Sequence, residues 1–141
     1  RVRAVALQKG VIVEIDPDRI EQILENLLQN AMRYTPGDST IDIAIYPKGK
    51  LAVLTIRDHG PGIPVDKLET IFDRYYQLND DTGQKAGGQG MGLAIARRLA
   101  RVHGGDLYVR NLIDGGAEFT LELPLLRFEK SSQSTKKNQD S

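Results

Sequence analysis

A chain of 141 residues is long enough to bury a hydrophobic core and suggests a single domain. The 19 Lys and Arg residues balance the 19 Asp and Glu residues, and this neutral composition gives no support for a nucleic-acid partner. Cysteine is absent, which excludes disulfides and thiolate metal sites, and no apolar run approaches the length that spans a membrane.

The first predicted elements are a strand and a long amphipathic helix. Residues 11–15 are rich in β-branched side chains, which is typical of a strand. Asp16 and Pro17 then provide an N-cap residue and a proline at the first helical position. Apolar residues recur at helical spacing from Ile20 to Ala31, so we expect one buried stripe on a helix that ends before Pro36-Gly37.

One edge of that helix carries Asn26, Asn30 and Arg33. Spacings of four and three residues place these side chains on the same side of the helix, beside the apolar stripe. Asparagine is a mediocre helix former, so two on one edge need an explanation. One explanation is a solvated flank. The other is a ligand site, in which amide oxygens face a hard cation and the guanidinium faces phosphate oxygens.

A β-hairpin is predicted next. Residues 40–46 alternate between apolar and polar side chains, which predicts a strand with one buried face. Residues 51–56 form a second strand, and the turn between the two is expected at residues 47–50.

Asp58 follows the second strand of the hairpin and precedes Gly60 and Gly62. Glycines beside a carboxylate leave room for a ligand, and a carboxylate accepts hydrogen bonds from an exocyclic amine such as that of adenine. A plain Asp/Gly turn is the alternative. His59 is expected to be a loop residue without a chemical role.

The segment from residue 65 to 76 predicts a short helix, with apolar bulk from Phe72, Tyr75 and Tyr76. Residues 79–88 are polar, contain glycine and show no periodicity. We interpret them either as a flap that closes over a ligand and excludes water, or as an ordinary surface loop.

A glycine-rich stretch, with four glycines within residues 87–92, leads directly into a helix over residues 92–103. Such a backbone can turn tightly and approach a ligand, and the helix start adds unpaired N–H groups that suit phosphate. A packing turn or a flexible loop is the alternative. On the helix, Arg97, Arg98 and Arg101 lie opposite the apolar face and are predicted to be solvated. His103 is predicted to cap or pack the helix end.

Two further strands, over residues 106–112 and 119–125, are joined through residues 114–116. The expected fold is α+β, a two-layer sandwich in which helices cover one face of a mixed, mostly antiparallel sheet. We expect one domain over residues 1–126 and a disordered tail over 127–141. The chain begins at Arg1 without a Met, so we also expect it to be a piece of a longer protein, whose other parts could include a membrane anchor.

The order and spacing of these stretches resemble the catalytic and ATP-binding domain of sensor histidine kinases. That domain belongs to the GHKL superfamily, shared with DNA gyrase, mismatch-repair ATPases and heat-shock chaperone ATPases, and the resemblance covers roughly residues 10–125. Residues 26–36 resemble the N box, 58–62 the first glycine box, 72–76 the F box, 88–93 the second glycine box and 115–116 a final one. The resemblance implies a Bergerat-type fold that binds ATP and Mg²⁺.

The resemblance also implies roles for individual residues. Asn30 would be the principal magnesium ligand, Asn26 would support the triphosphate side, and Arg33 would contact phosphate, so these three form the implied catalytic set. Asp58 would bind the adenine amino group. The other implied nucleotide-binding residues are Tyr34, Gly60, Gly62, Ile63, Gly88, Gln89, Gly90, Met91, Gly92 and Leu93.

Two positions depart from the family pattern. Ala117 stands where much of the superfamily has a threonine near adenine, so a water-mediated adenine contact could be absent or replaced. Met91 replaces a common leucine, which should change only the packing of the flap.

The implied function is transfer of the γ-phosphoryl group of ATP to a histidine on a separate dimerisation domain, in two-component signalling. That domain would be the direct partner, and a response regulator an indirect one. Neither His59 nor His103 suits the acceptor role, so this chain alone should bind ATP without phosphorylating itself. We expect a cytoplasmic location without nucleic-acid or direct membrane contact, in a parent protein that could be membrane-anchored.

Three alternatives remain at this point: a GHKL-type ATPase, a serine kinase of the same fold, and a nucleotide-binding module without catalysis. In the hydrolysing relatives a glutamate serves as general base where this chain has Asn26. An amide cannot accept a proton at neutral pH, and the neighbouring Glu25 should point elsewhere on the helix, so hydrolysis should be slow. This favours the kinase, in which positioning and charge stabilisation do most of the work.

Overall fold

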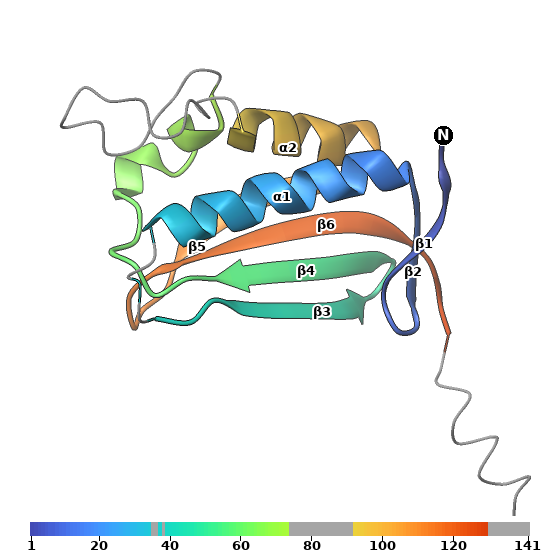
Figure 1. The fold of residues 1–141 in the computed structure, drawn as a ribbon, viewed down its shortest axis with the longest axis horizontal. Coiled ribbons are helices and arrows are strands. Elements are labelled where there is room, and N and C mark those ends of the chain that lie inside the picture. Colours follow the sequence, from blue (N-terminus) through green and yellow to red (C-terminus); the bar gives the residue numbers. More distant parts are fainter. Residues whose placement is uncertain (35–36, 38, 74–91, 130–141) are drawn as a thin grey trace, which may run out of the picture.

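The computed structural model describes residues 1–34, 37, 39–73 and 92–129. Two α-helices lie on one side of a six-stranded sheet (Figure 1). The strands are β1 (Arg3–Gln8), β2 (Val11–Ile15), β3 (Asp42–Lys48), β4 (Leu51–Arg57), β5 (Asp106–Asn111) and β6 (Ala117–Phe128). The helices are α1 (Pro17–Tyr34) and α2 (Gly92–Val102), with short 3₁₀ helices η1 (Val65–Lys67) and η2 (Thr70–Phe72). The expected α+β two-layer fold is confirmed.

The strand β6 is the centre of the sheet. The strand order is β1-β2-β6-β4-β3, and β5 also pairs with β6. The whole of β4 pairs along one edge of β6, whereas β5 pairs with its first half and β2 with its last residues. All five strand pairs in the described part of the chain are antiparallel.

The core lies between the sheet and the two helices. The predicted stripe of α1 is confirmed, because Ile23 and Ala31 are fully buried and Ile20 and Leu27 nearly so. On α2 the fully buried side chains are Ala96 and Ala100, and such small residues let the helix approach its neighbours closely. Alternate residues of β4 and β6 complete this layer.

The sheet face away from the helices is polar. Arg57, Glu118 and Arg110 lie opposite one another on β4, β6 and β5. The Glu118 carboxylate accepts hydrogen bonds from Arg57 Nε at 2.6 Å and Arg110 Nε at 2.7 Å. Burial alone would raise the pKa of Glu118, but these two arginines hold the pKa below its ordinary value. These two ion pairs therefore link strands β4, β6 and β5 on this face of the sheet.

Several sequence predictions differ from the structure. The strand β1 was not predicted, because its Ala-rich alternation is weak and the strand is mostly exposed. The helix predicted over 65–76 is wrong over its described part, which forms η1 and η2; Asp73 is extended, and residues 74–76 lie outside the described residues. No side-chain cap hydrogen bond starts either 3₁₀ turn, and a helix lacking such caps is easily shortened.

The strand boundaries also differ. Pro47 and Lys48 pair with β4, so the predicted turn is confined to residues 49–50. Ile43 is 51% exposed on the edge strand β3, where the alternation predicted a buried face. The strand β6 begins at Ala117 and continues to Phe128, past the position where the sequence placed the domain end, and residues 130–141 lie outside the described residues.

Candidate functional site

The Asp58 carboxylate is built into the fold at the end of β4. The side chain is buried, with 6% exposure. Its Oδ1 accepts hydrogen bonds from the backbone N–H groups of Gly60 at 3.0 Å and Ala117 at 3.1 Å. The Asp58 backbone N–H donates to the Ala117 oxygen at 3.0 Å. Within the described residues Oδ2 makes no hydrogen bond, so this oxygen is available to a ligand donor.

Gly116 permits this close approach of Asp58 to β6. Its φ is 86°, in the left-handed region, and a Cβ atom here would collide with the backbone oxygen of Asp58. The predicted final glycine pair at residues 115–116 therefore has a structural function in the turn before β6. A glycine at position 116 allows the β5–β6 hairpin to place the Ala117 N–H beside the Asp58 carboxylate.

A small cavity of about 30 Å³ lies between α1 and the loop after β4. Asn30 from α1 and Asp58 from the loop line it, as do Ala117 and Phe119 from β6. Pro61, Gly62 and Ile63 complete the lining. Two stretches that the sequence singled out, the asparagine edge and the Asp/Gly turn, thus meet in space although 28 positions separate Asn30 from Asp58.

The asparagine edge of α1 also contacts the start of α2. The Asn26 side chain donates from Nδ2 to the Gly92 backbone oxygen at 3.1 Å. This bond joins two elements 66 positions apart and fixes the side-chain amide toward the first turn of α2. The N–H groups of that first turn have no partner within the helix, and this is the end where an anion is stabilised.

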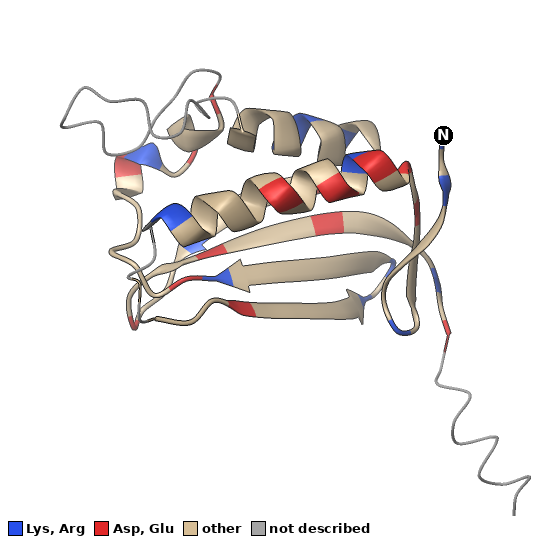
Figure 2. Ribbon diagram, viewed as in Figure 1, with Lys and Arg blue, Asp and Glu red and all other residues tan. Residues whose placement is uncertain are grey.

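The remaining predicted site residues are placed as follows. Arg33 is exposed in the last turn of α1, and Figure 2 shows the positive charge at this end of the helix. Gly60 is half-buried in the loop, and Leu93 packs against the core from α2. The Tyr34 side chain and all of Gly88, Gln89, Gly90 and Met91 lie outside the described residues, as does the predicted flap over 79–88.

Two polar residues near the site were missed by sequence reasoning. Asn111, at the end of β5, makes two hydrogen bonds to the backbone of Ile63. Arg97 was predicted to be solvated, and this is wrong, because its side chain is only 14% exposed. Neither role has a local signal, since each depends on a partner that is distant in the sequence.

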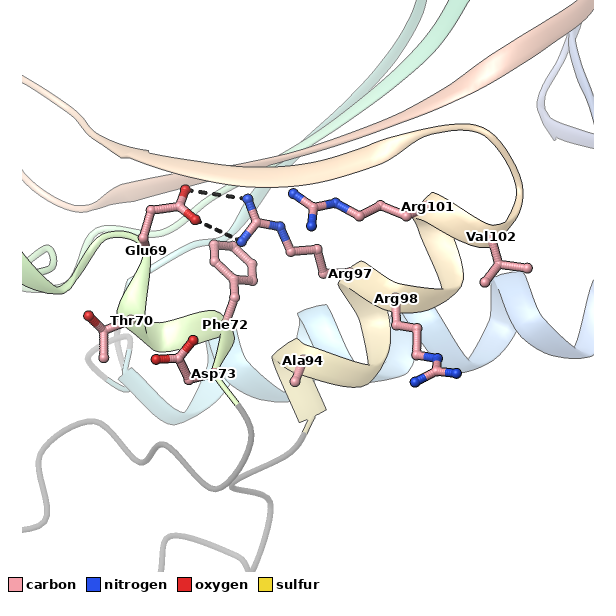
Figure 3. Close-up of a pocket in the computed structure, with 9 residues that line it drawn as sticks. All are labelled: Glu69, Thr70, Phe72, Asp73, Ala94, Arg97, Arg98, Arg101 and Val102. Atoms are coloured by element: carbon pink, nitrogen blue, oxygen red, sulfur yellow. Dashed lines mark hydrogen bonds and ion pairs between the residues drawn. The ribbon is translucent and has the colours of Figure 1, made fainter.

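Arg97 connects η2 to α2 (Figure 3). Its guanidinium bonds both carboxylate oxygens of Glu69, at 2.9 and 3.3 Å, and lies 4.3 Å from the centre of the Phe72 ring. The hydrogen bonds from Arg97 hold the pKa of Glu69 below its ordinary value. Nε of Arg97 lies 3.6 Å from an Asp106 oxygen, near enough for attraction between charges but too far for a hydrogen bond. Arg97 therefore braces the segment that ends at Asp73 against the helix that begins at Gly92.

A second, wider cavity of about 640 Å³ is lined by the residues of this brace, Glu69, Phe72 and Arg97, among others. Thr70, Asp73 and Ala94 contribute to its wall together with the exposed Arg98, which Figure 3 shows pointing away from Glu69. It shares no lining residue with the cavity that contains Asp58. The solvated position predicted for Arg98 and Arg101 is confirmed.

The histidines and Glu25 match their predicted places. His59 is half-exposed, and its Nε2 lies 3.2 Å from Asp42 Oδ2 at the loop surface. His103 Nδ1 lies 2.8 Å from the Leu99 oxygen in the last turn of α2, which is a capping contact. Glu25 is exposed on α1. Asn26, beside it, is half-buried toward α2, so the two neighbouring side chains point in different directions.

The described residues contain neither a cluster of metal-ligating side chains nor a helix that could span a membrane. No group of three or more His, Cys, Asp or Glu side chains is arranged to hold a metal ion in that part of the chain. None of the helices in the described ranges is long and apolar enough to cross a membrane.

The chain is similar to known proteins in both sequence and structure. The family model described as "Histidine kinase-, DNA gyrase B-, and HSP90-like ATPase" matches residues 15–127. The sensor histidine kinase WalK of Bacillus subtilis (strain 168) is 37% identical over 118 residues, which are 82% of this chain and 19% of that protein. The chain spans about a fifth of the length of the curated relatives it matches.

Two solved structures show the likeness of the fold. The nucleotide-free catalytic domain of the histidine kinase ThkA aligns with a TM-score of 0.71 at 32% identity, over 82% of this chain and 72% of that one. Full-length ShkA in complex with AMPPNP aligns with a TM-score of 0.68 at 30% identity, over 87% of this chain and 25% of that one.

Proposed function

The chain belongs to the family of histidine kinase-, DNA gyrase B- and HSP90-like ATPases, and from this premise we propose that it binds Mg-ATP and phosphorylates a histidine on a separate dimerisation domain. The observation that carries the proposal is the cavity shared by Asn30 and Asp58. It brings an amide suited to a hard cation beside a carboxylate suited to a purine amine.

The adenine end of the ligand would meet Asp58. Oδ1 is occupied by two backbone N–H groups, so the carboxylate is fixed in orientation and Oδ2 is the oxygen left for the exocyclic amine. Gly62 and Ile63 line the same cavity and would face the base. Ala117 offers a methyl group at this position, so a water-mediated contact to the base could be absent or replaced.

The phosphate end would lie between α1 and α2. Asn30 would bind Mg²⁺, and Asn26, already held toward the start of α2, would support the triphosphate. The backbone N–H groups over residues 88–93 would bind the phosphates, and Arg33 would contact them from the exposed end of α1. Mg²⁺, when bound at Asn30, would neutralise the charge that develops during transfer.

In the transfer step, a nitrogen of the acceptor imidazole attacks the γ-phosphorus while the bond from that phosphorus to the β–γ bridging oxygen breaks. ADP leaves with the electron pair, and the imidazole proton passes to solvent. The chain's own contribution is to hold ATP with the γ-phosphate directed outward. A cognate response regulator would then receive the phosphoryl group from the histidine, and the domain would act in the cytoplasm.

Hydrolysis is the second candidate, and the described geometry favours transfer. Asn26, at the position of the general base in hydrolysing relatives, donates its amide to Gly92 and cannot take a proton from water. Glu25 is exposed on α1 and directed away from this contact. A Glu25→Ala variant should therefore keep any weak hydrolysis that the wild type shows.

The test combines the chain with γ-labelled ATP, Mg²⁺ and a dimerisation domain that carries an acceptor histidine. Appearance of an acid-labile phosphate on that domain is the expected result, and a domain whose histidine is replaced by alanine is the control. Release of inorganic phosphate at a steady rate without transfer would show an ATPase. Bound nucleotide with neither product would show a binding module.

A further inference from the structure

We propose that Asn111 is a positioning residue for nucleotide recognition, holding the loop that presents Asp58 and Ile63 to the base. The inference rests on the proposed function, because it concerns how firmly the adenine-facing side of that site is built. Asn111 is the last residue of β5 and is not among the described residues that line the cavity, so it would act through Ile63.

The contact between Asn111 and Ile63 uses both ends of the side-chain amide. Oδ1 accepts a hydrogen bond from the Ile63 N–H at 2.8 Å, and Nδ2 donates to the Ile63 oxygen at 2.6 Å. One side chain thus satisfies the two backbone groups of a residue 48 positions away, as a neighbouring strand would. Ile63 is 8% exposed, so loss of the amide would leave those groups poorly hydrated.

The same hairpin holds both ends of the loop. At one end, Asp58 Oδ1 accepts from the Ala117 N–H, and at the other end Asn111 binds Ile63. Asn111 and Ala117 are themselves opposite residues in the pairing of β5 with β6. The separation of Asp58 and Ile63 is therefore fixed by a single pair of residues in the sheet, and the loop has little freedom to widen.

The absence of a side chain at Gly62 leaves room for the Asn111 amide. Its φ is 82°, and a Cβ atom here would lie 3.0 Å from Asn111 Oδ1, closer than such contacts normally are. Asn111 therefore packs against the backbone of Gly62 while it bonds to Ile63. Two of the residues that line the cavity are positioned by one side chain outside it.

The test measures Kd for ATP and GTP, with and without Mg²⁺, for wild type and Asn111→Leu. Leucine has a similar size but no hydrogen-bonding group. We expect ATP affinity to fall about tenfold, since the Ile63 backbone groups lose their partners, and the preference for ATP over GTP to shrink. The gain in affinity on adding Mg²⁺ should stay at the wild-type ratio, because the metal side of the site lies on α1.

Asn111→Ser is a second variant in case the leucine chain does not fold. Its hydroxyl can meet one of the two Ile63 groups, so its affinity should lie between those of wild type and Asn111→Leu. Ile113→Ala is the control, because this fully exposed side chain lies in the same hairpin. It should bind as wild type does.

The outcomes separate the two proposals. If wild type does not bind ATP, the proposed function fails. If wild type binds ATP and the folded Asn111 variants keep both its affinity and its preference over GTP, the positioning role of Asn111 is overturned, even if their thermal stability is lower. If the variants lose the Mg²⁺ effect instead, Asn111 acts on the phosphate side and the inference is equally wrong.

Discussion

The loop after β4 and Asn30 of α1 face the same cavity, but the protein holds them differently. In the loop after β4, two backbone N–H groups bind Asp58 Oδ1, and the Asn111 amide binds the backbone of Ile63. On α1, Arg33 is exposed, and Asn30 reaches the cavity from a helix whose backbone needs no help from it. In the proposed site, the base side would thus be organised before any ligand arrives, whereas Asn30 and Arg33 would be completed by a bound metal ion and phosphate.

The largest expected effect is on the open side. Asn30→Ala should abolish Mg²⁺-dependent transfer to a supplied acceptor domain, because the variant lacks the amide oxygen proposed to hold the metal. Affinity for ATP without Mg²⁺ should change little. Gln29→Ala, an exposed neighbour on the same helix, is the control. Full transfer by the Asn30 variant would contradict the proposed metal role of Asn30, because the metal would then depend on another residue.

On the organised side, Asp58→Asn should weaken ATP binding by up to about a hundredfold, because a charged acceptor is replaced by a neutral amide in a buried place. The Mg²⁺ effect should keep its wild-type ratio, which distinguishes this variant from Asn30→Ala. Titration calorimetry provides both values. Asp114→Asn, exposed in the β5–β6 turn, should bind normally. Unchanged affinity of the Asp58 variant would refute the adenine role.

Arg97 tests a contact outside the cavity, the brace between η2 and α2. Arg97→Ala removes the paired hydrogen bonds to Glu69 and the contact with the Phe72 ring, and should lower the free energy of unfolding by about 1–2 kcal/mol. Denaturant unfolding measures this. The exposed Arg98→Ala is the matched control and should cost less than about 0.5 kcal/mol. Equal effects of the two variants would show that the brace contributes nothing specific.

The smallest effect concerns Glu118, which follows Ala117 and ties β6 to Arg57 and Arg110. Its pKa is lowered in the folded state, so its stabilisation is present above the ordinary carboxyl pKa and is lost as pH falls through the lowered value. Glu118→Gln should reduce stability near neutral pH by about 0.5–1 kcal/mol. Its unfolding free energy should also fall less steeply on acidification. A wild-type slope in this variant would contradict the assignment.

The sequence predicted the elements whose signals are local. The stripe on α1 and the hairpin of β3 and β4 follow from the spacing of apolar residues, and the start of α2 at Gly92 follows from the helix-forming run after the glycines. Asp58 and Asn30 stood out at element edges, but the alternatives stayed open there and their roles came from the family resemblance. The structure brings the two residues to one cavity. Their assigned roles remain predictions that the variants above would test.

What the sequence could not show depends on distant pairing. The strand β1 gains its structure from β2, and Arg97 is buried only because Glu69 and Phe72 lie across from it. The bond from Asn111 to Ile63 joins residues 48 positions apart, and nothing around Asn111 marks it as different from a strand end. The helix over residues 65–76 was predicted from its apolar bulk, which does not distinguish an α-helix from the 3₁₀ turns η1 and η2.

The length of β6 has a mechanical consequence. This 12-residue strand begins beside Asp58 and ends where it pairs with β2, at the end of the molecule where the N-terminus also lies (Figure 1). A domain fused ahead of Arg1 would therefore join the fold at the end away from the cavity that Asp58 lines (Figure 1). In the proposed function, such a tether would leave the mouth of that cavity unobstructed.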